Sequence, residues 1–345
     1  MDLPLLFLPE KGVAWQGAPA LGSRPPRLGH DLRAVSSVVE HLPDTEGVTG
    51  SNPVSRTISF RPRSPFMSAA SPAPEELDAL LRLLDDETPA VRERVASRFA
   101  LCGGDLSEWL ASRPRSLTKQ ETSLLTEMLR PPRRELLERE WIAPSGGATA
   151  LQEDWETFEA LLRALSDFLH DGITLRQPLS DALDLLAEEA AEAGITTARE
   201  LGRYLFKDKR LTANQEDYHD PRNSDLAWSI AEGRSNPLGL CLIYILTGHR
   251  LNLEIEGVNF PGHFMCRIFE DGYPIIIDCF DKGQLHLQST LLESADLSHS
   301  QRTLLRHTAD PGSILIRLLG NLHGALEHAA RDEDAQLIRK LQATL

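Results

Sequence analysis

The chain has 345 residues, of which 41% are hydrophobic and 25% are charged, and its formal net charge at pH 7 is -15. This length and composition allow two modest domains with packed cores, while the negative charge argues against a nucleic acid or an anionic membrane as the main partner. The apolar runs are too short to cross a membrane and the four cysteines form no CxxC pair, so the sequence predicts a cytoplasmic protein with reduced thiols.

Residues 1–66 differ in composition from the rest of the chain. They hold 9 of the 22 prolines and show no sustained helical or strand period, so they cannot bury a core. The string "SSVVEHLPDTEGVTGSNPVSRT", residues 36–57, resembles a translation of the D-arm and T-arm of a tRNA gene. We therefore expect this stretch to be spurious upstream translation, with synthesis starting at Met67; a genuine disordered tail is the alternative.

A helical region is predicted for residues 67–149. Leucines at helical spacing between residues 77 and 84, and a second apolar period over 91–101, predict a helical hairpin. The hairpin resembles one HEAT repeat, and because one repeat cannot form a solenoid, we expect it to cap the following domain. The Pro- and Gly-rich stretch 131–149 predicts a joint, which places the domain boundary there.

The sequence predicts one α+β domain over residues 150–330, followed by a C-terminal helix over 331–345. The stretch "SNPLGLCLIYILTGHRL", residues 235–251, predicts a buried helix with a proline in its first turn. Short apolar runs separated by "PG" and "EDG" turns predict antiparallel strands. These runs are residues 253–260, 263–269 and 273–280.

Two polar side chains on the predicted strands suggest a catalytic pair. His263 follows the Pro-Gly turn and Asp278 ends the next apolar run, with Asp281 as a second candidate carboxylate. A thiol near the start of a helix, a histidine base and an aspartate that orients the histidine form a thiol catalytic site. Cys241 is the candidate thiol, although it lies four residues after Pro237 and gains little from the helix terminus.

Residues 218–287 resemble the transglutaminase-like superfamily, in particular its bacterial SirB-type family. The resemblance rests on "DPRNS", "NPLGLCLIY", "GVNFPGHF" and "IDCF", and a weaker likeness extends from about residue 150 to residue 326. It implies a papain/transglutaminase-like core, with a buried helix packed on an antiparallel sheet, and it implies that His263 and Asp278 are base and orienter. Catalytic members of the superfamily carry a cysteine in the first turn of the core helix, where this chain has Pro237 and Leu238.

Two functions from different classes therefore stay open. The first is a catalytically degenerate domain that binds a protein or peptide in the cleft that holds the active site in catalytic members of the superfamily. The second is an active thiol amidohydrolase, peptidase or acyl transferase that uses Cys241, His263 and Asp278. Neither needs a cofactor. The residues expected to line the cleft are Asn236, Pro237, Leu238, Gly239, Pro261 and Gly262.

Simpler structural roles compete with these assignments. Asn236 is also a natural helix cap, His263 can be a purely structural histidine, and the cysteines are by default buried apolar thiols. A zinc site made by Cys241, His263, Cys266 and Cys279 lacks closely paired ligands in the sequence. We therefore predict no metal.

Overall fold

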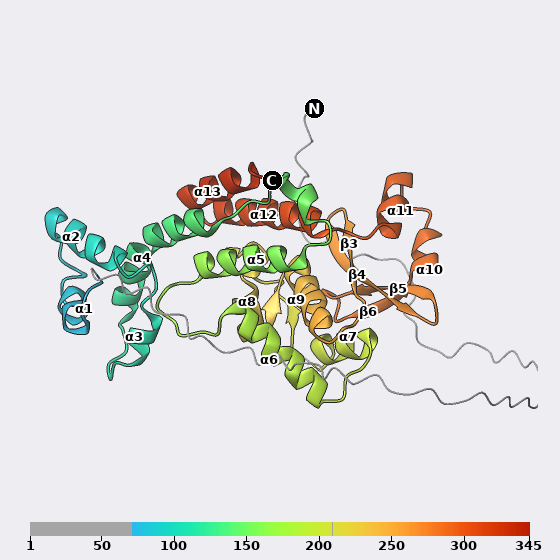
Figure 1. Cartoon of the computed structure of the whole chain (residues 1–345), viewed down its shortest axis with the longest axis horizontal. Coiled ribbons are helices and arrows are strands. Elements are labelled where there is room, and N and C mark those ends of the chain that lie inside the picture. Colours follow the sequence, from blue (N-terminus) through green and yellow to red (C-terminus); the bar gives the residue numbers. More distant parts are fainter. Residues whose placement is uncertain (1–70, 209) are drawn as a thin grey trace, which may run out of the picture.

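The computed structural model describes residues 71–208 and 210–345, so the predictions for residues 1–66 and for a start at Met67 lie outside the described residues. The chain mixes helices with an antiparallel sheet, which confirms the predicted α+β class. The N-terminal helices lie at one end of the molecule and the sheet at the other (Figure 1). In the described part of the chain, no helix combines the length and apolarity needed to cross a membrane.

The first helices form a small core of their own. They are α1 (Pro74–Leu81), α2 (Pro89–Ala100), α3 (Ser107–Ala111) and the first half of α4 (Lys119–Glu140). Proline at the start of α1 and of α2 fixes the first helical turn. Leucines of α1 and α4 pack against Phe99 of α2, and these side chains are buried separately from the main core.

Helix α4 joins this small core to the rest of the chain. The stretch 131–149 was predicted to be a joint, but its first part is helical up to Glu140, and Pro131 and Pro132 lie inside α4. Leu129 is buried in the small core and Leu137 in the main core, so apolar burial on both sides of the prolines holds the helix together. One long helix thus crosses from one core to the other.

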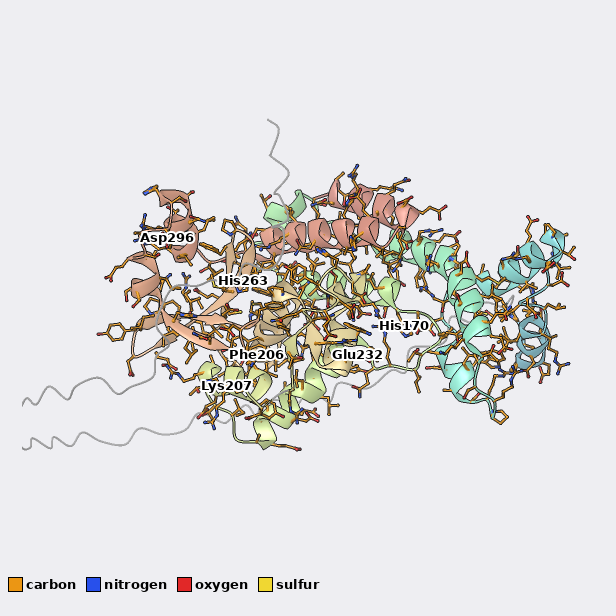
Figure 2. All side chains as sticks on the ribbon, turned by 180° about the vertical axis from the view of Figure 1, so that it is seen from behind. His170, Phe206, Lys207, Glu232, His263 and Asp296 are labelled. Carbon is orange, nitrogen blue, oxygen red and sulfur yellow. The ribbon has the colours of Figure 1, made fainter. Side chains whose placement is uncertain are left out.

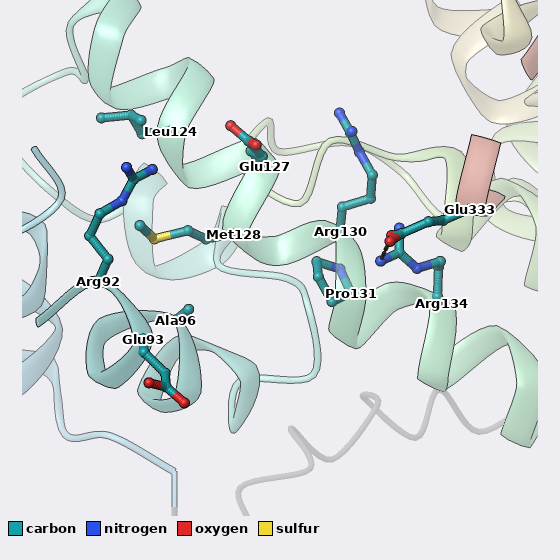
Figure 3. A pocket seen from close by; sticks show the side chains of 10 residues that line it. All are labelled: Arg92, Glu93, Ala96, Leu124, Glu127, Met128, Arg130, Pro131, Arg134 and Glu333. Atoms are coloured by element: carbon teal, nitrogen blue, oxygen red, sulfur yellow. Dashed lines mark ion pairs between the residues drawn. The ribbon is translucent and has the colours of Figure 1, made fainter. Parts of the chain in front are cut away.

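Charged side chains fasten α4 to the C-terminal helix α13 (Asp332–Gln342). Asp334 is 1% exposed, and its carboxylate accepts from Arg134 of α4 at 3.0 Å and from Arg331 at 2.6 Å. An open groove of about 390 Å³ lies beside these contacts, between α2, α4 and α13 (Figure 3). A buried carboxylate of this kind needs its partners, so the ion pairs hold α4 and α13 together.

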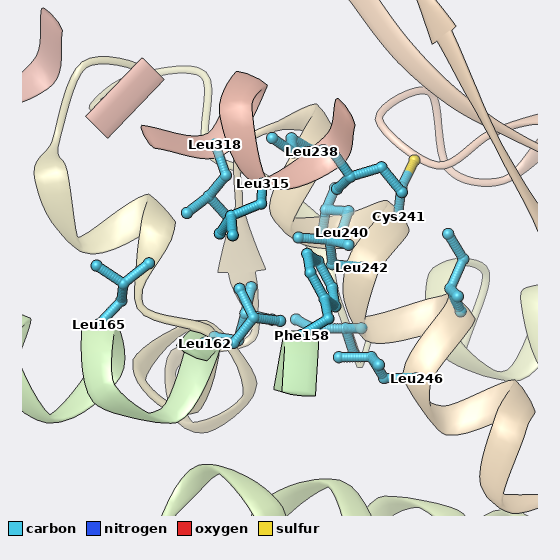
Figure 4. Packing of buried hydrophobic residues seen from close by; sticks show 14 of the residues in the cluster. Phe158, Leu162, Leu165, Leu238, Leu240, Cys241, Leu242, Leu246, Leu315 and Leu318 are labelled. Atoms are coloured by element: carbon cyan, nitrogen blue, oxygen red, sulfur yellow. The ribbon is translucent and has the colours of Figure 1, made fainter. Parts of the chain in front are cut away.

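The main core surrounds α9 (Pro237–Arg250), which is buried along almost its whole length. Helix α9 packs against the sheet and against three helices, α6 (Leu179–Glu192), α7 (Ala198–Phe206) and α8 (Leu226–Glu232). Its leucines meet Phe158 and Leu162 of α5 (Trp155–Leu169) (Figure 4). The remaining helices are the short η1 (Gly147–Leu151) and η2 (Pro221–Ser224), α10 (Gln288–Leu292), α11 (His299–Arg306) and α12 (Pro311–His328).

Four strands form an antiparallel meander in the order β3-β4-β5-β6. They are β3 (Glu256–Phe260), β4 (His263–Glu270), β5 (Tyr273–Asp278) and β6 (Gln284–Leu287). Tight turns join them, and Gly262 supplies the positive φ of 76° that the first turn requires. The two-residue strands β1 (Thr212–Ala213) and β2 (Arg234–Ser235) pair in parallel beside α9. The predicted strands are thus present in the predicted order.

The two faces of the sheet meet different partners. Cys266 pairs with Ile277, so these side chains share the face on which α9 packs. Their neighbours Met265 and Ile276 point to the other face, where they pack beneath α10 and α11. This alternation decides which candidate site residues can meet.

Candidate functional site

His263 and Asp278 lie side by side at one end of the sheet. His263 begins β4 and Asp278 ends β5, and the register places both on the face of Met265 and Ile276. The His263 Nε2 atom lies 2.8 Å from Asp278 Oδ1, with side chains 25% and 13% exposed. The distance is that of an ion pair, but the N–H direction does not meet hydrogen-bond geometry, so Nε2 lacks an in-line acceptor.

The environment of the pair shifts both pKa values in the directions that favour the charged forms. Burial lowers the pKa of His263, but the Asp278 carboxylate raises it more, so the pKa lies above its ordinary value. Burial raises the pKa of Asp278, but His263 and the backbone N–H groups of Phe280 and Asp281, each 3.0 Å from Oδ1, lower it on balance. Asp281, the second candidate carboxylate, is exposed and contributes only this backbone donor.

An aromatic ring lies beside His263, and an arginine contacts the turn before it. The Phe280 ring lies 6.3 Å from the His263 ring and 6.1 Å from the ring of Tyr218, which is 36% exposed. Arg317 of α12 donates to the Phe260 carbonyl oxygen at 2.8 Å, at the turn before His263. Figure 2 shows His263 in the sheet half of the molecule, far from His170 near the N-terminal helices.

A small apolar cavity lies next to the pair, under α10 and α11. It has a volume of about 20 Å³, which is room for about one water molecule. Its lining residues are Phe260, His263, Met265, Asp278, His286, Leu291, Leu297 and Leu305. The six residues expected to line a cleft are not among them.

Those six residues occupy two different environments. Asn236 caps α9 by accepting from the Gly239 backbone N–H at 2.8 Å, and Pro237, Leu238 and Gly239 are buried behind it. The turn residues 261–262 are exposed instead. The start of α9 therefore presents no side chain that could serve as a nucleophile.

Cys241 and His263 lie on opposite faces of the sheet. Cys241 lies on α9, which packs on the opposite face of the sheet, and its side chain has no exposed surface. Its thiol donates to the Phe264 carbonyl oxygen at 3.5 Å. The backbone of β4 thus stands between the Cys241 sulfur and the imidazole. In Figure 4 this sulfur points away from Phe158 and Leu162, toward the sheet.

Cys241 instead meets two other cysteines. The sulfur atoms of Cys241, Cys266 and Cys279 lie within 4.8 Å of one another, and all three side chains are buried. His263 does not belong to this group, so the four-ligand arrangement considered from the sequence is not formed. Burial raises the pKa of Cys266 and Cys279 well above the usual thiol range. For Cys241, burial opposes ionisation, but contacts with those two thiols lower the pKa on balance.

Asn223 organises the loop that carries Tyr218, a role that the sequence did not predict. Its amide donates to the carbonyl oxygens of Asp217 at 2.8 Å and Tyr218 at 3.0 Å, and its side chain is 1% exposed. The Asn223 carbonyl oxygen accepts from Ser235 at 2.9 Å. The loop and the start of α9 are therefore fixed to one another beside the site.

Comparison with known proteins agrees with this geometry. Residues 174–320, which include the sheet, α9 and the His263–Asp278 pair, match the family model of the transglutaminase-like superfamily. This part of the chain is therefore similar to transglutaminase-like domains. No solved structure matches the chain.

The curated relatives are of two kinds. UPF0162 proteins of Xylella fastidiosa and Pseudomonas aeruginosa are 33% and 31% identical to this chain, over 38% and 35% of its length. The matches cover 49% and 47% of those relatives, so the chain spans about half the length of each. F-box only protein 21 of Mus musculus is 27% identical over 39% of this chain and 22% of its own length.

Proposed function

We propose that the transglutaminase-like domain binds a protein or peptide beside His263 and Asp278 and does not perform thiol catalysis. The observation that carries the proposal is the position of Cys241, which is buried on the far face of the sheet. The first turn of α9 offers Pro237 and Leu238, neither of which can attack a carbonyl group. A charged pair without a nucleophile is suited to recognition.

The groups around the pair fit a peptide ligand. The ionised His263–Asp278 pair offers both a donor and acceptors for amide groups. Tyr218 supplies an exposed aromatic surface next to Phe280, and aromatic side chains carry much of the energy of protein interfaces. The cavity next to His263 is too small for a side chain, so the ligand would lie across the outside of the site.

The alternative is an active thiol enzyme that uses Cys241, His263 and Asp278. One observation favours it: the pKa of Cys241 is lowered and that of His263 is raised, the directions expected of a thiolate–imidazolium pair. The sheet backbone between the two groups weighs against it, because proton transfer requires them within hydrogen-bond reach. Activity that survived Cys241→Ser would remove this alternative.

Photo-crosslinking tests the binding role. A photoreactive amino acid at position 218 reports on the proposed site, and the same residue at position 273, at the far end of β4 and β5, is the matched control. We expect position 218 to capture a partner of unchanged mass, and we expect His263→Ala in a folded chain to abolish capture. Equal capture from position 273, or a partner recovered cleaved or deamidated, would contradict the proposal.

We also propose that the domain is of the SirB type. The motifs "DPRNS" and "GVNFPGHF" support this assignment, and both lie inside the region that matches the superfamily model. The first motif contains Asn223, which holds the Tyr218 loop, and the second leads into His263.

A further inference from the structure

Three cysteines from separate segments of the chain converge in the main core. Cys241 comes from α9, Cys266 from the middle of β4 and Cys279 from the residue after β5. Their sulfur atoms lie within 4.8 Å of one another, and none of the three side chains is more than 1% exposed. Three mutually adjacent sulfur atoms form a possible ligand set, which a single buried cysteine does not.

The spacing of the sulfur atoms matches a three-coordinate metal. Metal–sulfur bonds of about 2.3 Å, arranged in a plane at equal angles, place the sulfur atoms about 4.0 Å apart. The Cys266 and Cys279 sulfur atoms are 3.9 Å apart. The three sulfur atoms lie within 4.8 Å of one another, so small side-chain rotations are enough to bring all three into bonding distance of one ion.

The ligand set selects a soft ion. Thiolates favour Cu(I), zinc and iron–sulfur clusters, but structural zinc sites are almost always four-coordinate. In the described residues, the group offers three ligand atoms and no fourth from histidine or carboxylate. Cu(I) is stable with three thiolate ligands in a plane.

We propose that Cys241, Cys266 and Cys279 form a trigonal thiolate site for one Cu(I) ion. Binding forms three Cu–S bonds and releases the three thiol protons, with no change in oxidation state. The bound site carries a net negative charge, and the cationic side chains whose charge reaches Cys241 are Arg317 and His263. The proposal is independent of the binding role of His263 and Asp278.

The chain also offers a route to the buried cluster. Cys279 begins the connection between β5 and β6, and residues 281–282 of that connection are exposed. A local opening of this connection would break the hydrogen bonds that Phe280 and Asp281 donate to Asp278, and it would bring the Cys279 sulfur closer to solvent.

Competition with a chelator tests the site. The reduced, metal-free full chain is titrated without oxygen into the coloured complex of Cu(I) with bicinchoninate. We expect the chain to withdraw one equivalent of Cu(I), and Cys266→Ser or Cys279→Ser to weaken binding by more than about 100-fold, since even outer-shell partners of a metal contribute about 10–100-fold. Cys102→Ser is the matched control and should bind like the unmutated chain, because Cys102 lies in the separate N-terminal core.

X-ray absorption of the copper-loaded, unmutated chain provides a test that does not depend on the folding of variants. The proposal predicts a first shell of three sulfur atoms at about 2.3 Å. A shell containing nitrogen or oxygen, or a chain that leaves all copper on the chelator, would overturn it. Unweakened binding by folded Cys279→Ser would do the same.

Discussion

The coupling between His263 and Asp278 can be measured with a double-mutant cycle. The variants are His263→Gln, Asp278→Asn and the double mutant, each of which removes a charge while keeping a polar side chain. The cycle isolates the pairwise free energy, because other effects of each substitution cancel. We expect the coupling to be favourable at pH 6 and smaller at pH 9.

The expected magnitude follows from the 2.8 Å separation and from the partial burial of both groups. Two unit charges at that distance attract by about 6 kcal/mol when the effective dielectric constant is about 20. Lost hydration offsets most of this attraction, which leaves a coupling within the roughly 0.5–3 kcal/mol found for residues in contact. We therefore expect a coupling free energy of about 2 kcal/mol at pH 6.

The sign of the pH dependence follows from the two pKa shifts. The pKa of His263 is raised in the folded chain, so its contribution to stability is present below the ordinary histidine range and is lost as the pH rises through the folded-state pKa. The pKa of Asp278 is lowered, so its contribution is present above the ordinary aspartate range and is lost as the pH falls. The coupling should therefore be strongest between about pH 5 and about pH 6.5.

Urea unfolding of the four proteins at pH 6 and pH 9 gives the coupling free energy at each pH. Asp281→Asn is the matched control, because Asp281 is an exposed carboxylate three residues from Asp278. The control should change stability by less than about 0.5 kcal/mol. A coupling that is as large at pH 9 as at pH 6 would refute the assignment of an ionised pair.

Three further substitutions test how the site is supported. Gly239→Ala should destabilise the fold by about 1–3 kcal/mol, because the added Cβ would lie 2.2 Å from Ser235 Oγ and 2.9 Å from the Asn223 carbonyl oxygen. Adding Ser235→Ala to the Gly239→Ala chain should restore only part of the lost stability. Full restoration would show that the contact with the Asn223 backbone is unimportant. Asn223→Ala should cost about 2–3 kcal/mol and speed amide hydrogen exchange around Tyr218, whereas unchanged exchange would mean that other contacts hold the loop. Asp334→Ala should cost about 3–5 kcal/mol in urea unfolding, because it leaves two arginines without their buried carboxylate, and a loss below 1 kcal/mol would contradict that role.

Much of the sheet and its pair of polar residues could be predicted from the sequence. Alternating apolar runs separated by Pro-Gly and Asp-Gly turns indicate a meander, and a meander puts consecutive strands side by side. The position of His263 at the start of one strand and of Asp278 at the end of the next therefore placed both at the same end of the sheet. The apolar stretch around Cys241 likewise indicated a buried helix.

Other parts depend on tertiary contacts that no local pattern records. Arg317 reaches the turn before His263 from a helix more than fifty residues away in sequence. The convergence of three cysteines depends on which face of the sheet α9 covers. Helix α4 continues past Pro131 because residues on both sides are buried, although local propensity favours a break there.

The reactivity of Cys241 tests the central claim most directly. Iodoacetamide in limiting amount, with peptide mass spectrometry, reports the labelling rate of each cysteine of the metal-free full chain from about pH 5 to about pH 9. We predict that Cys241 stays unlabelled until urea unfolds the chain. Cys102 is half-buried, and burial raises its pKa to about 11, so its labelling rate should increase as the pH rises. Fast labelling of Cys241 at pH 6 that His263→Ala abolishes would establish a thiolate–imidazole pair and contradict the account.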